Sequence, residues 1–217
     1  MGDVKIKLFD NGDEWLEGRK SRIGGSDAGS IMGVNPWKDN VTLWREKTGL
    51  AKPKDLSGNK LVDYGKEAET YLRSLFELDH PEYIMHYKDF NMWSNEKYPF
   101  AHASLDGWLE EQDSIRLGIW ECKTTEIASS SQWEKWDGRI PDTYYCQILH
   151  YMAVTGFDFA VLTAQIKYRK DGQMYKTTRD YHIERSDVQD DIDALIEEEK
   201  AFYDCILNNR MPNMKLP

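Results

Sequence analysis

The chain has 217 residues, which is enough for one folded domain with a sizeable apolar core. Its net charge is −10, from 28 Lys and Arg against 38 Asp and Glu, and this argues against a general nucleic-acid binder with a broad positive field. No apolar run is long enough for a transmembrane helix and the N-terminus lacks a signal-peptide core, so we expect no membrane association.

The cysteines indicate the cellular compartment, and the charge distribution indicates where the chain could contact DNA. Cys122, Cys146 and Cys205 form no C-x-x-C pair and are odd in number, which predicts a reduced, cytoplasmic protein without a four-cysteine iron–sulfur cluster. Residues 1–60 hold 11 Lys and Arg against 9 Asp and Glu, a net charge of +2. Any contact with DNA is therefore expected to be local, favouring this N-terminal block and a few inward basic side chains.

Six helices are expected from apolar spacing and from start and stop residues. Trp15 and Leu16 are expected to face inward on the first. Ser26 is a natural N-cap for the second, Pro141 suits the first turn of the fifth, and Ser186 opens a Ser-x-x-Gln capping box for the last. The predicted helices are residues 10–20, 26–33, 41–48, 59–78, 141–154 and 186–208.

Strands are expected where β-branched and aromatic residues alternate between turn signals. Lys170-Asp171-Gly172 predicts a hairpin turn between the last two strands. Residues 129–138 are polar, contain Trp133 and Trp136, and either contact DNA or simply pack. The predicted strands are residues 83–93, a strand entered through 100–103 that carries Asp106, and residues 115–124, 157–168 and 173–184.

The most informative residues are an acid and a Glu-x-Lys triplet. Asp106 stands before a turn at residues 110–114, and Glu121-Cys122-Lys123 lies in the apolar strand that follows. Side chains alternate along a strand, so Glu121 and Lys123 face the same way. A hairpin would bring Asp106 beside Glu121. A lone Glu-x-Lys is usually an exposed pair on an ordinary strand, but the upstream acid at hairpin distance favours a catalytic site here.

This residue set suits metal-assisted phosphodiester hydrolysis. Divalent cations stabilise the charge that develops on the phosphate, and Mg²⁺ needs only one or two carboxylates because it keeps several waters. Asp106 and Glu121 would be these carboxylates, with the Cys122 carbonyl as a third ligand. Lys123 would hold or deprotonate the attacking water.

At this point the chain resembles the YqaJ-like viral recombinase exonucleases, the group that includes phage lambda exonuclease, within the PD-(D/E)xK nuclease superfamily. Four blocks carry the resemblance over residues 10–165: residues 15–19 with 23–28, residues 65–69, Ser104-Leu105-Asp106-Gly107 with Glu121-Cys122-Lys123, and residues 145–152. Leu105 stands where the superfamily has a proline. The resemblance implies one α/β domain over residues 1–217, with a restriction-endonuclease-like core whose central mixed β-sheet is flanked by helices. Its parts would be a helical segment (1–80), a catalytic sheet core (81–185) and a C-terminal helix (186–209).

The resemblance also implies roles for individual residues. Asp106 and Glu121 match the main metal ligands, Lys123 the catalytic lysine, and Glu69 a helical acid that completes the metal site. Two Mg²⁺ or Mn²⁺ ions are implied. Arg19 and Ser26 match residues that bind the 5′-terminal phosphate, and Ser104 matches a residue near the scissile phosphate. Gln147 matches a glutamine that supports the lysine or the substrate. Tyr151 lies on the same helical face as Gln147 and is therefore a candidate for substrate contact.

Some of these residues could instead have purely structural roles. Arg19 near a helix end is favoured by the helix dipole, and a helix N-terminus at Ser26 is both a capping position and an anion site. Glu69 alone would be an exposed helical acid, and Gln147 could simply pack. Among the eight tryptophans, Trp37 and Trp133 are the first candidates for DNA contact because they are expected in loops.

The function predicted from this resemblance is 5′-to-3′ digestion of linear double-stranded DNA, which releases 5′ mononucleotides and leaves 3′ single-stranded tails for phage-type recombination. The resemblance implies that a single-strand annealing protein is the partner and that the protein assembles as a trimeric ring threaded by the duplex. It also implies that the protein acts in a bacterial host cell that carries the phage or prophage gene. The alternatives are a structure- or site-selective endonuclease with the same core, an inactive protein that binds DNA ends, and an RNase.

Overall fold

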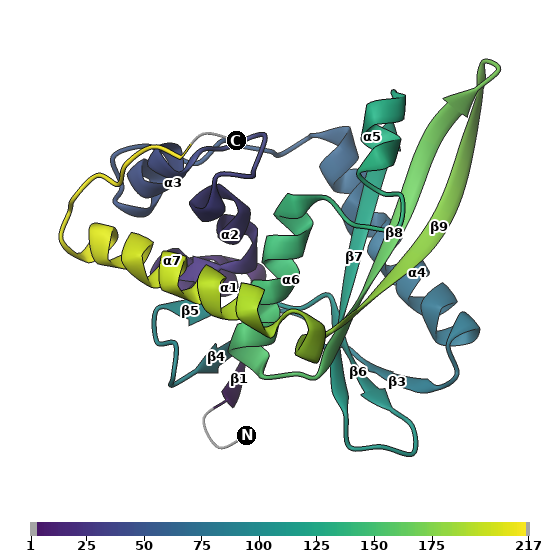
Figure 1. Cartoon of the computed structure of the whole chain (residues 1–217), viewed down its shortest axis with the longest axis horizontal. Helices are drawn as coiled ribbons and strands as arrows, with labels where there is room; N and C mark the ends of the chain where they lie inside the picture. Colours follow the sequence, from purple (N-terminus) through teal and green to yellow (C-terminus); the bar gives the residue numbers. More distant parts are fainter. Residues whose placement is uncertain (1–3, 216–217) are drawn as a thin grey trace.

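The computed structural model describes residues 4–215, and its centre is a five-stranded mixed sheet in the order β3-β6-β7-β8-β9 (Figure 1). The five strands are β3 (Tyr83–His86), β6 (Gly107–Glu111), β7 (Leu117–Ile127), β8 (Phe159–Lys170) and β9 (Gln173–Glu184). Strands β7 and β8 are parallel and the other pairs are antiparallel. The predicted central mixed sheet flanked by helices is confirmed.

Helices cover both faces of this sheet. On one face lie α6 (Asp142–Thr155) and α7 (Gln189–Leu207), with α2 (Gly25–Met32) packed against α6. Helix α4 (Lys60–Asp79) packs Leu72 and Phe76 on the other face, against Trp120. Two small sheets pair β1 (Val4–Leu8) with β4 (Asn91–Asn95) and β2 (Ile23–Gly24) with β5 (Ala101–His102). The remaining elements are α1 (Gly12–Lys20), α3 (Asn40–Lys47), α5 (Ser130–Glu134) and the 3₁₀ turn η1 (Arg185–Asp187).

Helix α6 is the centre of the larger core. It is buried from Cys146 to Thr155, as expected for a helix that is apolar around most of its circumference. Its polar His150 is fully buried, contacts Glu199 of α7 at 2.7 Å and bonds through Nε2 to the His102 carbonyl at 2.8 Å. This buried pair fixes α6 against both α7 and β5, and therefore fixes the side chains that α6 directs toward β7.

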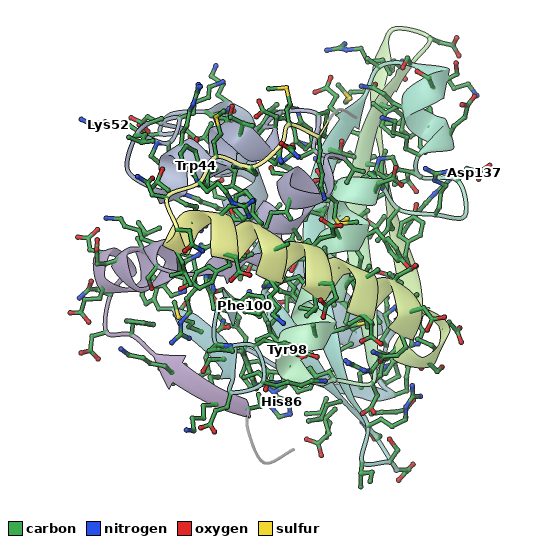
Figure 2. All side chains as sticks on the ribbon, turned by 60° about the vertical axis from the view of Figure 1, so that its left-hand side comes forward. Trp44, Lys52, His86, Tyr98, Phe100 and Asp137 are labelled. Carbon is green, nitrogen blue, oxygen red and sulfur yellow. The ribbon has the colours of Figure 1, made fainter. Side chains whose placement is uncertain are left out.

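Helix α7 closes the same face from outside. Its Ile192 and Leu195 are almost completely buried, and each such side chain contributes about 1.5–3 kcal/mol to stability. Phe100 lies beside α7 in Figure 2, with its ring 5.9 Å from that of Tyr203. None of the helices among residues 4–215 is long and apolar enough to cross a membrane.

Several local predictions were wrong, each for a physical reason. The strand expected at residues 83–93 is two strands, because Phe90 turns the chain with a φ of 51°. Ser26 lies in the first turn of α2, whose N-cap is Gly24, and Asp27 accepts the Gly24 N–H. Leu16 is 53% exposed and does not face inward.

Other helix and strand ends also differ from the prediction. Pro141 is the N-cap of α6 and not its first residue. The last helix begins after η1, and no side chain caps it, so the capping box at Ser186 does not form. Residues 130–134 form the short helix α5, and Ile115 is 96% exposed and lies before β7.

Candidate active site

Strand β7 presents Glu121 and Lys123 on one face, toward α6. The Lys123 Nζ lies 2.5 Å from Glu121 Oε1, and Glu121 is almost completely buried. Strand alternation explains the shared face, as expected from the sequence. The pair therefore sits at the boundary between the central sheet and the core helix.

Asp106 joins this pair through strand pairing. It lies immediately before β6, whereas the sequence predicted it within a strand. Its neighbour Gly107 pairs with Trp120, so the next step of the register sets Asp106 opposite Glu121. The Asp106 Oδ2 accepts the backbone N–H of Cys122 at 3.0 Å. The hairpin thus brings the two acids to neighbouring positions.

A third acid, Glu69, comes from α4. Its carboxylate forms an ion pair with Arg73 at 2.7 Å. Burial raises the pKa of Glu69 to about 7, with a further contribution from the charge of Asp106 and an opposing one from Arg73. The charge of Asp106 thus acts on Glu69, although Glu69 is held by its own arginine.

The acids strongly perturb one another. Burial raises the pKa of Glu121 to about 8, and the negative charge of Asp106 adds to the shift. Burial by itself would lower the pKa of Lys123, but the carboxylates of Glu121 and Asp106 outweigh it and raise that pKa. Lys123 is therefore an ammonium ion in this arrangement, which suits holding a water or phosphate oxygen better than abstracting a proton.

Gln147 on α6 completes the contacts of Glu121. Its Nε2 donates to Glu121 Oε1 at 2.7 Å and to the Tyr151 hydroxyl at 2.9 Å. Gln147 and Tyr151 are one helical turn apart and face the same way. The structure therefore brings both predicted residues to the acid pair.

Arg19 and Ser104 meet through a tryptophan. The Arg19 guanidinium stacks 4.2 Å from the ring of Trp15. The Trp15 indole N–H donates to the Asn91 carbonyl at 3.0 Å and also lies 3.3 Å from Ser104 Oγ. Burial raises the pKa of Asp106, and the positive charges of Lys123, Arg73 and Arg19 oppose this shift.

The N-terminus of α2 approaches the site from another direction. A Cβ at Gly25 would collide with the ring of Tyr151, so this close approach requires glycine. Ser26 follows directly and is exposed. An exposed hydroxyl in the first turn of a helix is compatible with anion binding.

Comparison with known proteins identifies the family. Residues 14–158 match the YqaJ-like viral recombinase domain. The chain belongs to this family. The protein is also 32% identical over 206 residues to an uncharacterized protein, YqaJ, of Bacillus subtilis strain 168, covering 92% of this chain. It spans 58% of that relative's length.

Solved structures share the fold of this YqaJ-like chain. An alkaline exonuclease from Laribacter hongkongensis, LHK-Exo, superposes with a TM-score of 0.58 at 18% identity, covering 91% of this chain and 97% of that chain. A phage-related exonuclease from Haemophilus somnus 129PT gives a TM-score of 0.52 at 14% identity, covering 87% and 96%. At these identities the likeness establishes the fold.

The donor set of the YqaJ-like site suits a hard divalent cation. Glu121 Oε2 is buried and has no hydrogen-bond partner within residues 4–215. No three His, Cys, Asp or Glu side chains in this part of the chain are grouped so that they could hold a metal ion. Two carboxylates and a backbone carbonyl nevertheless match Mg²⁺, which keeps several water ligands. Asp106, Glu121 and the Cys122 carbonyl are thus the groups that would hold such an ion.

Sequence reasoning missed two neighbours of the site. Arg73 binds Glu69 and stacks 3.4 Å from the Tyr87 ring, and its spacing of four residues from Glu69 on a helix was the available signal. The ring of Tyr144 lies 5.3 Å from Lys123 Nζ. No local pattern marks Tyr144, because only the packing of α6 on β7 brings it there.

A basic arm was also missed. Beyond Tyr168, the last residue of β8 paired with β7, the two strands β8 and β9 continue together to the tip seen in Figure 1. The β8–β9 arm, defined as residues 164–179 and so including the last residues of β8 that still pair with β7, carries five basic residues against one acid, a net charge of +4 in a chain of net charge −10. The basic residues of the arm are Lys167, Arg169, Lys170, Lys176 and Arg179.

Proposed function

We propose that this protein is a metal-dependent exonuclease that digests linear double-stranded DNA from the 5′ end. The observation that carries the proposal is the pairing of Asp106 with Glu121 and Lys123, at one end of β6 and on β7. Membership of a viral recombinase family supports it, as does the fold shared with two exonucleases. The products would be 5′ mononucleotides and a 3′ single-stranded tail.

The chemistry follows from what each side chain can do. Two Mg²⁺ or Mn²⁺ ions, held by Asp106, Glu121 and the Cys122 carbonyl with Glu69 nearby, would supply the positive charge that stabilises the transition state. The ammonium of Lys123 holds the attacking water, and Gln147 keeps the carboxylate of Glu121 in place. The water oxygen would bond to phosphorus and lose a proton to solvent, while the bond from phosphorus to the 3′ oxygen would break and that oxygen would take up a proton. The released nucleotide would end in a 3′ hydroxyl, and the remaining strand would keep a 5′ phosphate.

Polarity would come from recognition of the 5′-terminal phosphate. Arg19 supplies a fixed positive charge whose guanidinium plane is already stacked on Trp15. Ser26 adds a hydroxyl at the positive end of the α2 dipole. Ser104 lies within hydrogen-bonding distance of the same tryptophan and two residues before Asp106. Together these groups would provide a phosphate site separate from the catalytic pair.

Retention of DNA would combine local charge with assembly. The net charge of −10 leaves the β8–β9 arm and the N-terminal block as the places with excess positive charge. A homotrimeric ring around the duplex would retain the substrate without a broad positive field. A single-strand annealing protein would receive the 3′ tail in the cytoplasm of a bacterial host that carries a phage or prophage.

One digestion experiment tests the proposal. A linear duplex labelled at either end, with or without a 5′ phosphate, is incubated with Mg²⁺, and EDTA serves as the control. The expected result is labelled mononucleotide from the 5′-labelled strand, faster with the phosphate, and no reaction in EDTA. A covalently closed circle should resist; its cleavage would favour the endonuclease. Binding without digestion would favour an inactive end-binding protein, and digestion of an RNA duplex alone would favour an RNase.

A further inference from the structure

Arg73 holds a fixed positive charge on the α4 side of the acids. Its guanidinium pairs with Glu69 at 2.7 Å and stacks 3.4 Å from the ring of Tyr87. The ring of Trp120, the residue before Glu121 on β7, lies 5.9 Å away. The Arg73 side chain is only 12% exposed, and its Nε is buried without a hydrogen-bond partner within residues 4–215. Because a guanidinium carries a permanent charge, Arg73 is an enclosed cation that the protein itself supplies.

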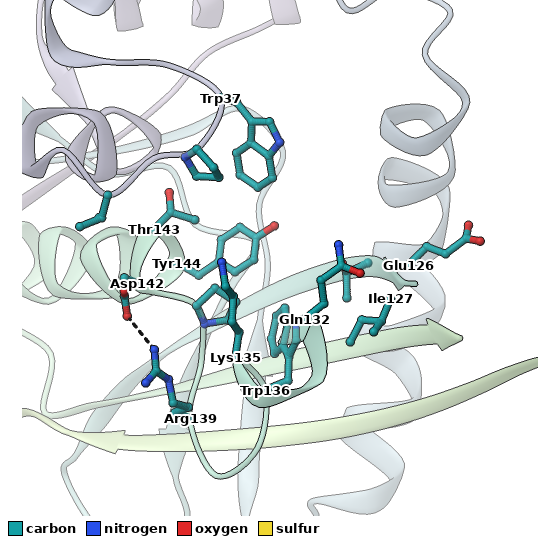
Figure 3. Close-up of a pocket in the computed structure, with 14 residues that line it drawn as sticks. Trp37, Glu126, Ile127, Gln132, Lys135, Trp136, Arg139, Asp142, Thr143 and Tyr144 are labelled. Carbon is teal, nitrogen blue, oxygen red and sulfur yellow. Dashed lines mark hydrogen bonds and ion pairs between the residues drawn. The ribbon is translucent and has the colours of Figure 1, made fainter. Parts of the chain in front are cut away.

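The two faces of β7 differ in how open they are. On the α6 face, a cleft of about 320 Å³ is lined by Thr125 and Tyr144 (Figure 3), and the ring of Tyr144 lies 5.3 Å from Lys123 Nζ. Trp120 belongs to the opposite face by strand alternation and packs against α4. Figure 3 shows Glu126, on the same face as Trp120, directed away from the cleft. The cleft therefore gives access to the catalytic pair from the α6 side, whereas α4 covers the other side.

Glu69 is the acid that α4 contributes, and its contacts differ from those of the other two acids. Its Oε1 is taken by Arg73. Within residues 4–215, Glu69, Asp106 and Glu121 are not grouped so that the three could hold one metal ion. Glu121 Oε2, in contrast, is buried and has no hydrogen-bond partner in the same part of the chain. The free protein thus offers a cation Asp106 and Glu121, while the charge of Glu69 is already compensated.

The charge of the site also limits how many ions it accepts. Three ionised carboxylates against the two cations Lys123 and Arg73 leave a net charge of −1. One divalent ion brings this to +1, and a second would bring it to +3 in a buried place where solvent screens little. A phosphate group adds negative charge and oxygen ligands, both of which a second ion needs.

We propose that Arg73 is a positioning residue that keeps Glu69 from coordinating a metal, so that the free protein binds a single divalent ion through Asp106 and Glu121. This inference rests on the proposed function and deepens it. The second ion would then enter only with the phosphate of the DNA. The hydrolytic site would therefore be complete in the complex with DNA and incomplete in the free protein.

Counting bound Mn²⁺ by electron paramagnetic resonance tests the inference without DNA. The full chain is titrated with Mn²⁺, and the loss of the free-ion signal gives the number of ions bound per chain. We expect one ion for the wild type and two for Arg73→Met, which removes a charge and releases Glu69. Two ions that share a carboxylate should also give a spin-coupled spectrum. Arg73→Lys keeps a positive charge and should bind one ion.

The matched control is Arg116→Met. Arg116 also pairs with an acid, Glu184, and lies 5.2 Å from the ring of Phe159. Its replacement should leave the count at one ion, because Arg116 pairs with none of the three acids of the site. Two ions bound by Arg116→Met would show that loss of any paired arginine has this effect, and would overturn the inference.

The double variant Arg73→Met with Glu69→Gln provides a second test. Replacing both members of a buried ion pair by neutral residues is often neutral for stability, so this variant is informative even if Arg73→Met does not fold. It should bind one ion, with an affinity within about 3-fold of the wild type, because no metal ligand has been removed.

Three results would overturn the inference. They are two ions bound by the free wild type, a single ion bound by folded Arg73→Met, and a loss of affinity of about 10-fold or more in the double variant, which would make Glu69 a ligand in the free protein. The ion count does not depend on cleavage. A wild type that binds one ion but fails to digest DNA in Mg²⁺ would overturn the proposed function alone.

Discussion

The side-chain amide of Gln147 donates a hydrogen bond to Glu121 Oε1 across 2.7 Å, and so joins helix α6 to strand β7 at the acid pair. The same oxygen receives the ammonium of Lys123 at 2.5 Å. The other oxygen, Oε2, is buried without a hydrogen-bond partner within residues 4–215. One oxygen of Glu121 is thus fixed by the protein while the other remains available to a cation.

Replacing Gln147 by Ala should lower kcat for DNA digestion about 10-fold to 100-fold and leave KM nearly unchanged. The lost bond reaches a charged group, and such bonds contribute about 1.5–3 kcal/mol. Steady-state digestion of a 5′-phosphorylated duplex measures both constants. Tyr151→Phe, which removes only the second acceptor of Gln147, should change kcat less than the Ala variant does. Normal kcat in Gln147→Ala would show that this bond has no part in catalysis.

Metal binding should depend on the carboxylate of Glu121. Isothermal titration of the wild type with Mn²⁺ should show binding that Glu121→Gln reduces at least 10-fold, because the neutral amide removes a charged ligand from a buried site. Glu110→Gln, a change at an exposed acid on β6, serves as the control and should bind as the wild type does. Equal affinity in the wild type and Glu121→Gln would place the metal elsewhere.

The sequence was a good guide wherever local chemistry decides the structure. Alternation along β7 correctly put Glu121 and Lys123 on one face. The Asp171-Gly172 turn formed as predicted, with φ values of 51° and 76° that suit a two-residue hairpin turn. The long helix with Glu69 was also correct to within one residue at each end, because Asn59 caps it as a helix start signal should.

The errors arose where tertiary contacts decide the structure. The turn at Phe90 interrupts a run that reads as one strand, and its neighbour Asn91 is fixed by bonds to Leu105 in a distant segment. Gly25 could not be recognised as a contact for Tyr151, since 126 positions separate them in the sequence. The position of Tyr144 beside Lys123 likewise follows from the packing of α6 on β7, not from local pattern.

The basic arm should contribute to DNA binding through phosphates. The double variant Lys170→Ser with Lys176→Ser should weaken binding and reduce the slope of log K against log salt by up to about 2, since each phosphate contact accounts for about 0.9. Filter binding at several salt concentrations measures this slope. The matched control is Lys88→Ser with Lys200→Ser, which removes two exposed lysines outside both the arm and the N-terminal block and should leave the slope unchanged. An equal change of slope in the control pair would contradict a specific role for the arm.

Acid should destabilise the fold through His102. Burial lowers the pKa of His102 to about 3, and the charge of His150 adds to this effect. The unfolded chain binds a proton near pH 6.5, so stability from this group is complete above pH 6.5 and is lost as pH falls toward 3. The loss approaches about 1.4 kcal/mol per pH unit.

Replacing His102 by Gln should therefore flatten the dependence of unfolding free energy on pH between about 6 and 4, relative to the wild type. Urea unfolding at a series of pH values provides the comparison. His86→Gln, at a histidine on the edge strand β3, should keep the wild-type slope. An unchanged slope in His102→Gln would assign the acid sensitivity to other groups.

The most direct test of the catalytic account is single-turnover digestion by Lys123→Ala. A 5′-phosphorylated linear duplex is bound in Ca²⁺, where Kd is measured, and is then mixed with Mg²⁺, where mononucleotide release is followed. The account predicts Kd within a few-fold of the wild type and a cleavage rate at least 10³-fold lower, because the water loses the ammonium that holds it. Mononucleotide release at the wild-type rate would contradict the account.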